Sequence, residues 1–302
     1  MGYGKIDFEL YRYTPNIPAA VIFVVLFAAT TLYHIYQLTR TRTWYFTAFV
    51  IGGIFQIIGY AGRIAAHWNK ENIPLYSIQT ILILLAPPLY AASIYMILGR
   101  LISHLQAEHF SIVPIRWMTG IFVTGDVFAF VMQGAVLDTE YPSPPEGGGI
   151  MATGTISAMD IGEKITIAGL SVQLIFFSFF VATSITFHRR IRREKTPMLS
   201  ELEAQGGMTR YRSWESVLWG LYISSVLILI RSIFRLIEYA QGNDGYLISH
   251  EVFMYVFDSV LMFMTMVAMN VFHPSVILAG IRKQRSMESI QSDSATQLQS
   301  LH

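Results

Sequence analysis

Cysteine is absent from this sequence of 302 residues, and charged residues make up only 14% of it. Without cysteine, neither a disulfide bond nor a thiolate metal site can form. Soluble domains usually contain roughly 25% charged residues, whereas 53% of the residues here are apolar. This composition predicts a membrane protein.

Sequence motifs of several membrane-protein classes are also missing. The chain has no GxxxxGK[ST] loop, so we expect no ATP hydrolysis by this chain. Histidine pairs with zinc-ligand spacing on a helix are absent, and we expect no metal, no cofactor and no enzymatic activity. A retinal Schiff base needs a lysine inside the helix bundle. The only lysine near such a position is Lys164, which lies at the outer end of the fifth apolar run, and this argues against a photoreceptor. Gly99-Arg100 stands where a G-protein-coupled receptor usually has an acidic-Arg-aromatic triplet, which weakens that assignment without removing it.

Seven apolar runs occupy most of the chain. A hydrocarbon core of about 30 Å requires about 20 helical residues. The runs lie near residues 17–38, 44–66, 76–102, 115–137, 161–187, 214–240 and 247–280. We therefore predict an all-α seven-transmembrane helix bundle in residues 17–280, between a short segment 1–16 and a disordered, Ser- and Gln-rich tail 281–302.

The distribution of Lys and Arg predicts the orientation. Of the Lys and Arg residues in the connecting segments, 14 lie on one side of the predicted membrane, including those from Arg189 to Lys195. Four lie on the other side. Cytoplasmic loops carry an excess of basic residues. We therefore expect the N-terminus outside the cytosol and the C-terminus inside it.

Two connecting segments have a composition of their own. Residues 138–160 contain YPSPPEGGG at 141–149 and predict a non-helical outer loop, either a cover over an external opening or a flexible connector. The basic loop 188–213 is a candidate site for a cytosolic partner or for anionic lipid headgroups.

Ionisable residues within the predicted spans are the candidate functional residues. A charge at the centre of a membrane helix costs about 2.5–3.5 kcal/mol on insertion scales, so these groups must be paired, hydrated or close to an interface. They are Arg63, Asp126, Arg231, Arg235, Glu238, Glu251 and Asp258.

The spacing of these residues places them on shared helix faces. Arg231, Arg235 and Glu238 follow at i, i+4 and i+7, and Tyr255 falls between Glu251 and Asp258 on the last helix. Asp126 shares a face with Gln133 in the same way. We predict one buried network around an outward-opening cavity. Two interpretations stay open: the network fastens the helices together, or it binds the polar headgroup of a lipid.

Prolines mark two further positions. Pro87 and Pro88 lie in the middle of the third apolar run, where a missing backbone donor predicts a kink and a candidate hinge. His273-Pro274 predicts a bend or the end of the last helix.

Several segments together resemble the fungal Rta-like family of lipid-translocating exporters, named for aminocholesterol resistance. They are GYAGR at 59–63, QTILILLAPPLYAASIYMILGR at 79–100, IFVTGDVFAFVMQG at 121–134, LILIRSIFRLIEYAQG at 227–242, HEVFMYVFDSVLM at 250–262 and HP at 273–274. The similarity extends over residues 11–280. Gln56 departs from it, because many relatives have Glu there.

The resemblance implies a multi-pass protein of the plasma membrane, or of the vacuolar membrane, that translocates amphiphilic lipids. Its partners would be membrane lipids and an amphiphilic substrate such as a sphingoid long-chain base, a sterol-like compound or a porphyrin. We expect no nucleic-acid partner, because the net charge is only +1 and the basic residues lie in short loops. The alternative is a receptor-like sensor or regulator of lipid asymmetry that transports nothing itself. The sequence predicts no oligomeric state.

Overall fold

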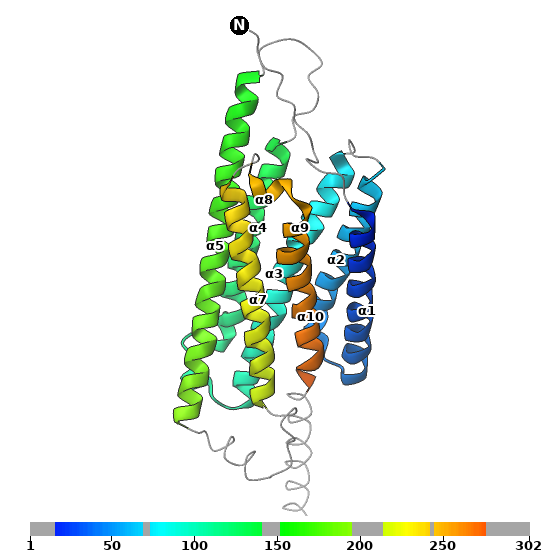
Figure 1. Cartoon of the computed structure of the whole chain (residues 1–302). Coiled ribbons are helices and arrows are strands. Elements are labelled where there is room, and N and C mark those ends of the chain that lie inside the picture. Colours follow the sequence, from blue (N-terminus) through cyan, green and yellow to red (C-terminus); the bar gives the residue numbers. More distant parts are fainter. Residues whose placement is uncertain (1–15, 69–72, 141–151, 195–213, 242–244, 276–302) are drawn as a thin grey trace, which may run out of the picture.

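The chain folds into a bundle of long helices in a computed structural model that describes residues 16–68, 73–140, 152–194, 214–241 and 245–275 (Figure 1). The helices are α1 (Ile17–Thr41), α2 (Thr47–Ala66), α3 (Ile73–His104), α4 (Ile115–Glu140), α5 (Ala152–Arg193), α7 (Trp214–Ala240), α8 (Tyr246–Ser249), α9 (Glu251–Met254), the π-helix η4 (Tyr255–Val260) and α10 (Leu261–Val271). Short 3₁₀ turns, η1 (Trp44–Phe46) and η2 (Glu108–Phe110), lie in two connections. Within the described ranges there is no strand, and seven spans are long and apolar enough to cross a membrane. The predicted seven-helix, all-α fold of an integral membrane protein is confirmed.

Local sequence signals explain where the helices begin and end. Asn16 caps α1, because its side-chain oxygen accepts a hydrogen bond of 3.2 Å from the backbone N–H of Ala19. At the other end of α1, Arg42 has a left-handed backbone conformation with φ 55°. The last span ends at Val271, short of the predicted residue 280 and two residues before His273-Pro274, where the sequence predicts a bend or an end. Residues 1–15 and 276–302, to which most of the predicted terminal segments belong, lie outside the described residues.

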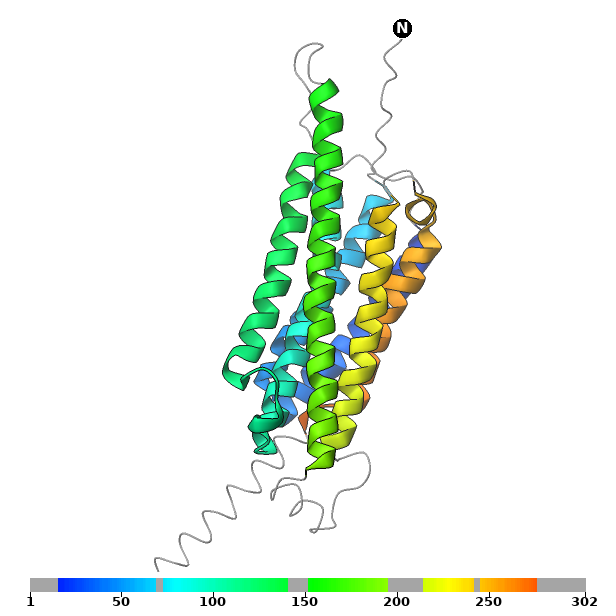
Figure 2. The same cartoon turned by 90° about the vertical axis from the view of Figure 1, so that its left-hand side faces the viewer.

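Helix α3 forms the centre of the bundle. It contacts α2, α4, α5 and α7, and its residues Tyr90, Ile94, Tyr95, Ile97 and Leu98 are fully buried. The helices α4 and α5 pack together at one edge of the bundle, and α1 lies at the other edge beside α2 and α10 (Figures 1 and 2). The core around α3 also includes buried side chains of the outer helices, such as Phe27 of α1, Phe122 of α4 and Phe180 of α5.

Pro87 and Pro88 do not end α3, which runs through both of them as one helix of 32 residues. Neither proline has an N–H group to donate, so the carbonyls of Ile83 and Leu84 lose their usual helical partners. The role of the two prolines as a hinge stays a prediction.

The predicted outer loop 138–160 is wrong at both of its ends. Helix α4 continues to Glu140 and α5 begins at Ala152, so only residues 141–151 lie between the helices, outside the described residues. With 42 residues, α5 is roughly 63 Å long, about twice the thickness of a bilayer core. Its first turns extend beyond the other helices (Figures 1 and 2). A helix outside the bilayer needs no apolar run, and apolar runs were the signal used to predict helices.

The basic loop 188–213 is likewise shorter than predicted, because α5 continues to Arg193. The last turn of α5 contains Arg190, Arg192 and Arg193. Cations are stabilised at a helix C-terminus by the partial negative charge of the free carbonyls. The predicted binding site in this loop falls largely on residues 195–213, outside the described residues.

Exposed tryptophans mark both ends of the bundle. Trp44, Trp117 and Trp219 lie near the starts of α2, α4 and α7, and Trp68 follows the opposite end of α2; each is more than half exposed. Tryptophan is enriched at the two membrane interfaces. Trp44 and Trp68 are 24 residues apart, which corresponds to about 36 Å along a helix. This distance fits a bilayer with one interface at each tryptophan.

Candidate functional site

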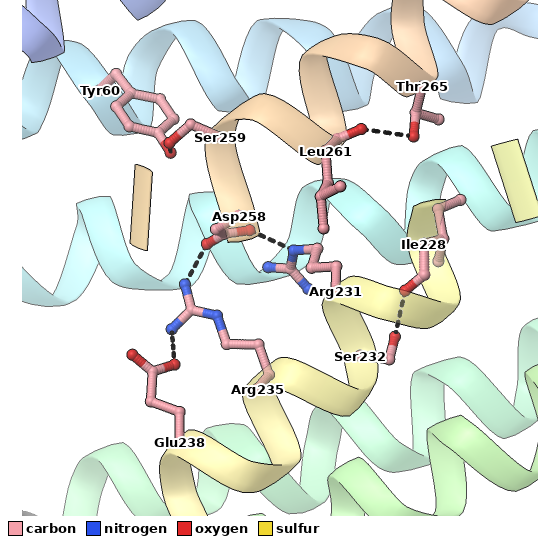
Figure 3. A network of polar contacts seen from close by, with 10 residues as sticks. All are labelled: Tyr60, Ile228, Arg231, Ser232, Arg235, Glu238, Asp258, Ser259, Leu261 and Thr265. Carbon is pink, nitrogen blue, oxygen red and sulfur yellow. Dashed lines mark hydrogen bonds and ion pairs between the residues drawn. The ribbon is translucent and has the colours of Figure 1, made fainter. Parts of the chain in front are cut away.

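Asp258 is the centre of a buried ion cluster between η4 and α7. Arg231 donates a hydrogen bond from Nε to one oxygen of Asp258, and Arg235 donates from Nη2 to the other (Figure 3). Nη1 of Arg235 also donates to Glu238 at 3.0 Å. The side chain of Asp258 is only 1% exposed. We call these four residues the Asp258 cluster.

The π-helix η4 places two adjacent residues of the last span in contact with different helices. Asp258 bonds to arginines of α7, while Ser259 shares a hydrogen bond with the hydroxyl of Tyr60 on α2 (Figure 3). Both residues are buried. π-helical turns are rare and often occur at functional sites. One short segment therefore joins α2 and α7.

Arg63 and Glu251 form a second ion cluster, at the end of α2 and the start of α9. Nη2 and Nε of Arg63 donate to Oε1 of Glu251 at 2.9 and 3.2 Å. The backbone N–H of Asn16 donates to both oxygens of Glu251, at 3.1 and 3.0 Å. Tyr255 completes the cluster: its hydroxyl donates to the carbonyl of Asn16 at 3.4 Å, and its ring centroid lies 5.6 Å from Cζ of Arg63. We call these four residues the Glu251 cluster.

Aromatic rings connect the two clusters. Tyr255 of the Glu251 cluster stacks on Phe23 of α1 with a centroid distance of 5.4 Å, and Phe23 stacks on Tyr60 at 5.9 Å. Tyr60 then reaches Ser259, the neighbour of Asp258. Together the clusters contain three arginines and three carboxylates, so they have no net charge when every group is ionised.

Asp126 and Gln133 of α4 lie apart from both clusters and face α3 and α5. Tyr95 of α3 donates a hydrogen bond of 2.9 Å to Oδ2 of Asp126. Nε2 of Gln133 donates to Gln173 of α5 at 3.5 Å. The structure therefore groups seven of the nine residues predicted for one network into two adjacent clusters, and leaves the two residues of α4 separate.

Sequence reasoning missed five residues that complete these contacts. They are Asn16, Tyr60, Tyr95, Gln173 and Ser259. Tyr60 precedes Arg63 by three residues and so shares its helix face, which is a signal that the sequence contains. The other four gave no such signal.

No group of three or more His, Asp or Glu residues in the described part of the chain is arranged to hold a metal ion. All buried carboxylates of the two clusters have arginine partners instead. The arrangement suits the binding of a charged or zwitterionic organic group, because such a group can replace one member of an ion pair.

Comparison with known proteins identifies the family. The sequence pattern of the family described as RTA1 like protein matches residues 49–281, a segment that includes all nine predicted residues. This chain belongs to that family. The family resemblance inferred from its sequence motifs is thus confirmed.

Several relatives of this RTA1-like chain have names that refer to transport. Protoporphyrin uptake protein 1 of Saccharomyces cerevisiae is 36% identical over 299 residues, covering 87% of this chain and 91% of the relative. Probable lipid transporter atnI of Emericella nidulans is 30% identical over 279 residues, covering 90% and 69%. Sphingoid long-chain base transporter RSB1 of Saccharomyces cerevisiae is 25% identical over 292 residues, covering 88% and 73%. No solved structure matches the chain.

Proposed function

We propose that this protein moves amphiphilic lipids across the plasma membrane without hydrolysing nucleotides itself. The observation that carries the proposal is the pair of ion clusters, each without net charge when its groups are ionised, inside a largely apolar bundle. A lipid headgroup needs a polar site within the membrane, whereas its hydrocarbon part needs apolar surroundings. The names of relatives that refer to a lipid and to a sphingoid long-chain base support this substrate class.

Side-chain exposure indicates where a headgroup would first meet the clusters. Glu251 and Arg235 are 13% and 14% exposed, whereas Asp258 and Arg231 are 1% and 3% exposed. A cationic headgroup, such as that of a sphingoid base, would displace Arg63 from Glu251. An anionic headgroup, such as a porphyrin carboxylate, would displace Glu238 from Arg235. The nearly inaccessible pair Arg231 and Asp258 would hold the helices in place.

The test is reconstitution of the purified protein in liposomes that contain a fluorescent long-chain base in one leaflet. A translocator moves the base to the other leaflet faster than protein-free liposomes do. A regulator without transport activity leaves the rate at background, and that result would end the proposal. Glu251→Gln should slow the movement several-fold if the headgroup enters at Glu251.

A matched control separates the site from a general loss of charge. Glu215 forms an exposed ion pair with Arg192 at 3.0 Å, with exposures of 40% and 62%. Glu215→Gln makes the same chemical change as Glu251→Gln but outside both clusters. It should leave the rate unchanged. Equal rates for Glu251→Gln and the wild type, at equal amounts of protein, would reduce the Glu251 cluster to a fastening role.

A further inference from the structure

Asp126 differs from the other buried carboxylates of the described residues because no cation pairs with it. Glu238, Glu251 and Asp258 each bond to an arginine. Asp126 is 3% exposed, and among the described residues its Oδ2 accepts only the hydroxyl of Tyr95 and its Oδ1 has no hydrogen-bond partner.

The surroundings of Asp126 are aromatic. Tyr95 lies 4.5 Å from Phe180 and 5.2 Å from Phe122 between ring centroids, and all three rings are fully buried. One residue before Asp126, a Cβ atom on Gly125 would come within 2.6 Å of the Phe176 ring, so α4 and α5 are in close contact here. Water therefore has little access to the carboxyl group.

Charged groups on the neighbouring helices are engaged elsewhere or lie far along the helix. On α3, Arg100 stacks over Tyr45 at 4.4 Å, and the Tyr90 hydroxyl donates to Met266. On α5, Lys164 and His188 are 24 residues apart towards opposite ends of its membrane span. On α4 itself, Arg116 lies in the first turn, ten residues before Asp126.

An ionised carboxylate in this position would be poorly stabilised. Removing a carboxylate from water costs several kcal/mol even after the protein relaxes, and here one neutral hydroxyl is the only compensation. A proton on Oδ1 removes the charge and leaves the bond from Tyr95 to Oδ2 intact. Intramembrane carboxylates of this kind serve as proton relays in pumps and transporters.

We propose that Asp126 is a proton-exchange site that couples lipid movement to a proton gradient. In the conformation described, Asp126 carries a proton on Oδ1. When the contact between α3, α4 and α5 opens during transport, the proton leaves and the carboxylate is free to pair with the cationic headgroup of the lipid. One proton moves against one cationic amphiphile per cycle. This inference rests on the proposed function.

The first experiment detects the proton directly. Infrared spectra of the purified protein should contain the C=O stretching band of a protonated, buried carboxyl group. Asp126→Asn should remove the band, Tyr95→Phe should shift it by removing the hydrogen bond, and Glu215→Gln should leave it unchanged. An identical band in the wild type and in Asp126→Asn, or no band in the wild type, overturns the proposal.

The second experiment measures coupling in liposomes with a pH difference across the membrane. The probe is a fluorescent long-chain amphiphile with a trimethylammonium headgroup, because its charge does not change with pH. Exchange of one proton for one amphiphile gives a tenfold accumulation per pH unit at equilibrium. Asp126→Asn should abolish the accumulation, because an amide neither carries the exchanged proton nor pairs with the cationic headgroup.

The outcomes separate this inference from the proposed function. If the wild type moves the probe but does not accumulate it, the proton coupling is refuted and the translocator remains. If the wild type does not move the probe above background, the proposed function is refuted, and the proton coupling that rests on it is refuted too. Asp126→Glu, which retains a carboxyl group, should restore accumulation, and this rescue distinguishes proton exchange from loss of folding.

Discussion

Arg63 and Glu251 are 188 positions apart in the chain and form an ion pair of 2.9 Å that ties the end of α2 to the start of α9. Glu251 also accepts the backbone N–H of Asn16, the residue that caps α1. One carboxylate thus holds three helices together. Its role in stability can be measured separately from any role in transport.

Replacing one member of this pair should destabilise the protein more than replacing both. Arg63→Met leaves Glu251, whose side chain is 13% exposed, without its counter-charge, and breaking such a largely buried pair typically costs about 3–5 kcal/mol. The double variant Arg63→Met with Glu251→Met removes both charges and should recover a large part of that loss. The measurement is a double-mutant cycle of unfolding free energies in one detergent. Additive losses would show that the two residues do not interact in the folded protein.

Asp258→Asn should be more damaging than Glu238→Gln. Asp258 bonds to both Arg231 and Arg235, whereas Glu238 bonds to Arg235 alone. Loss of the Asp258 charge leaves two buried arginines without a full counter-charge, and we expect a loss of about 3–5 kcal/mol. Glu238→Gln retains a hydrogen-bond acceptor and should cost about 1–3 kcal/mol. Thermal unfolding midpoints give the comparison.

The exposed pair of Arg192 and Glu215 is the reference for these charge changes. Exposed ion pairs contribute about 0–1 kcal/mol, so Glu215→Gln should have little effect on the unfolding midpoint. A similar loss for Asp258→Asn and Glu215→Gln would contradict the central position assigned to Asp258.

The sequence predicted the spans because bilayer thickness sets a length that apolar runs must reach. It also predicted which charges share a face, because Arg231, Arg235 and Glu238 follow the helical period. The sequence does not show which helices face one another. The prediction of one network therefore wrongly joins Asp126 with Asp258. The structure instead places Asp126 against Tyr95.

The π-helix at Tyr255–Val260 has no signature in the apolar pattern. Adjacent residues of a helix point in directions about 100° apart, so Asp258 and Ser259 contact different helices. Which helix each one contacts depends on how the helices pack, so the Tyr60 and Ser259 contact did not follow from the sequence. The pairing of Arg63 with Glu251, in contrast, agrees with the predicted spans, because the end of 44–66 and the start of 247–280 lie on the same side of the membrane in a seven-helix bundle.

Two glycines should respond oppositely to alanine. A Cβ atom on Gly169 of α5 would lie 2.9 Å from the backbone oxygen of Ala129 on α4, which cannot move without a shift of the helix. A Cβ atom on Gly120 would have no neighbour within 4 Å. Gly169→Ala should lower the unfolding free energy by about 1–3 kcal/mol. Gly120→Ala should raise it by about 0.5–1 kcal/mol, because alanine favours the helix. Equal effects would show that α4 and α5 are not in close contact.

The absence of native cysteine makes the predicted orientation directly measurable. Single cysteines introduced at Trp68 and at Glu108 lie at opposite ends of the bundle, and both side chains are exposed. The excess of Lys and Arg on one side predicts that Glu108 faces the cytosol. A membrane-impermeant maleimide should therefore label Trp68→Cys in intact cells and Glu108→Cys only after permeabilisation. The wild type gives no background, so the reverse pattern would place the N-terminus in the cytosol and the Glu251 cluster at the cytosolic end of the bundle.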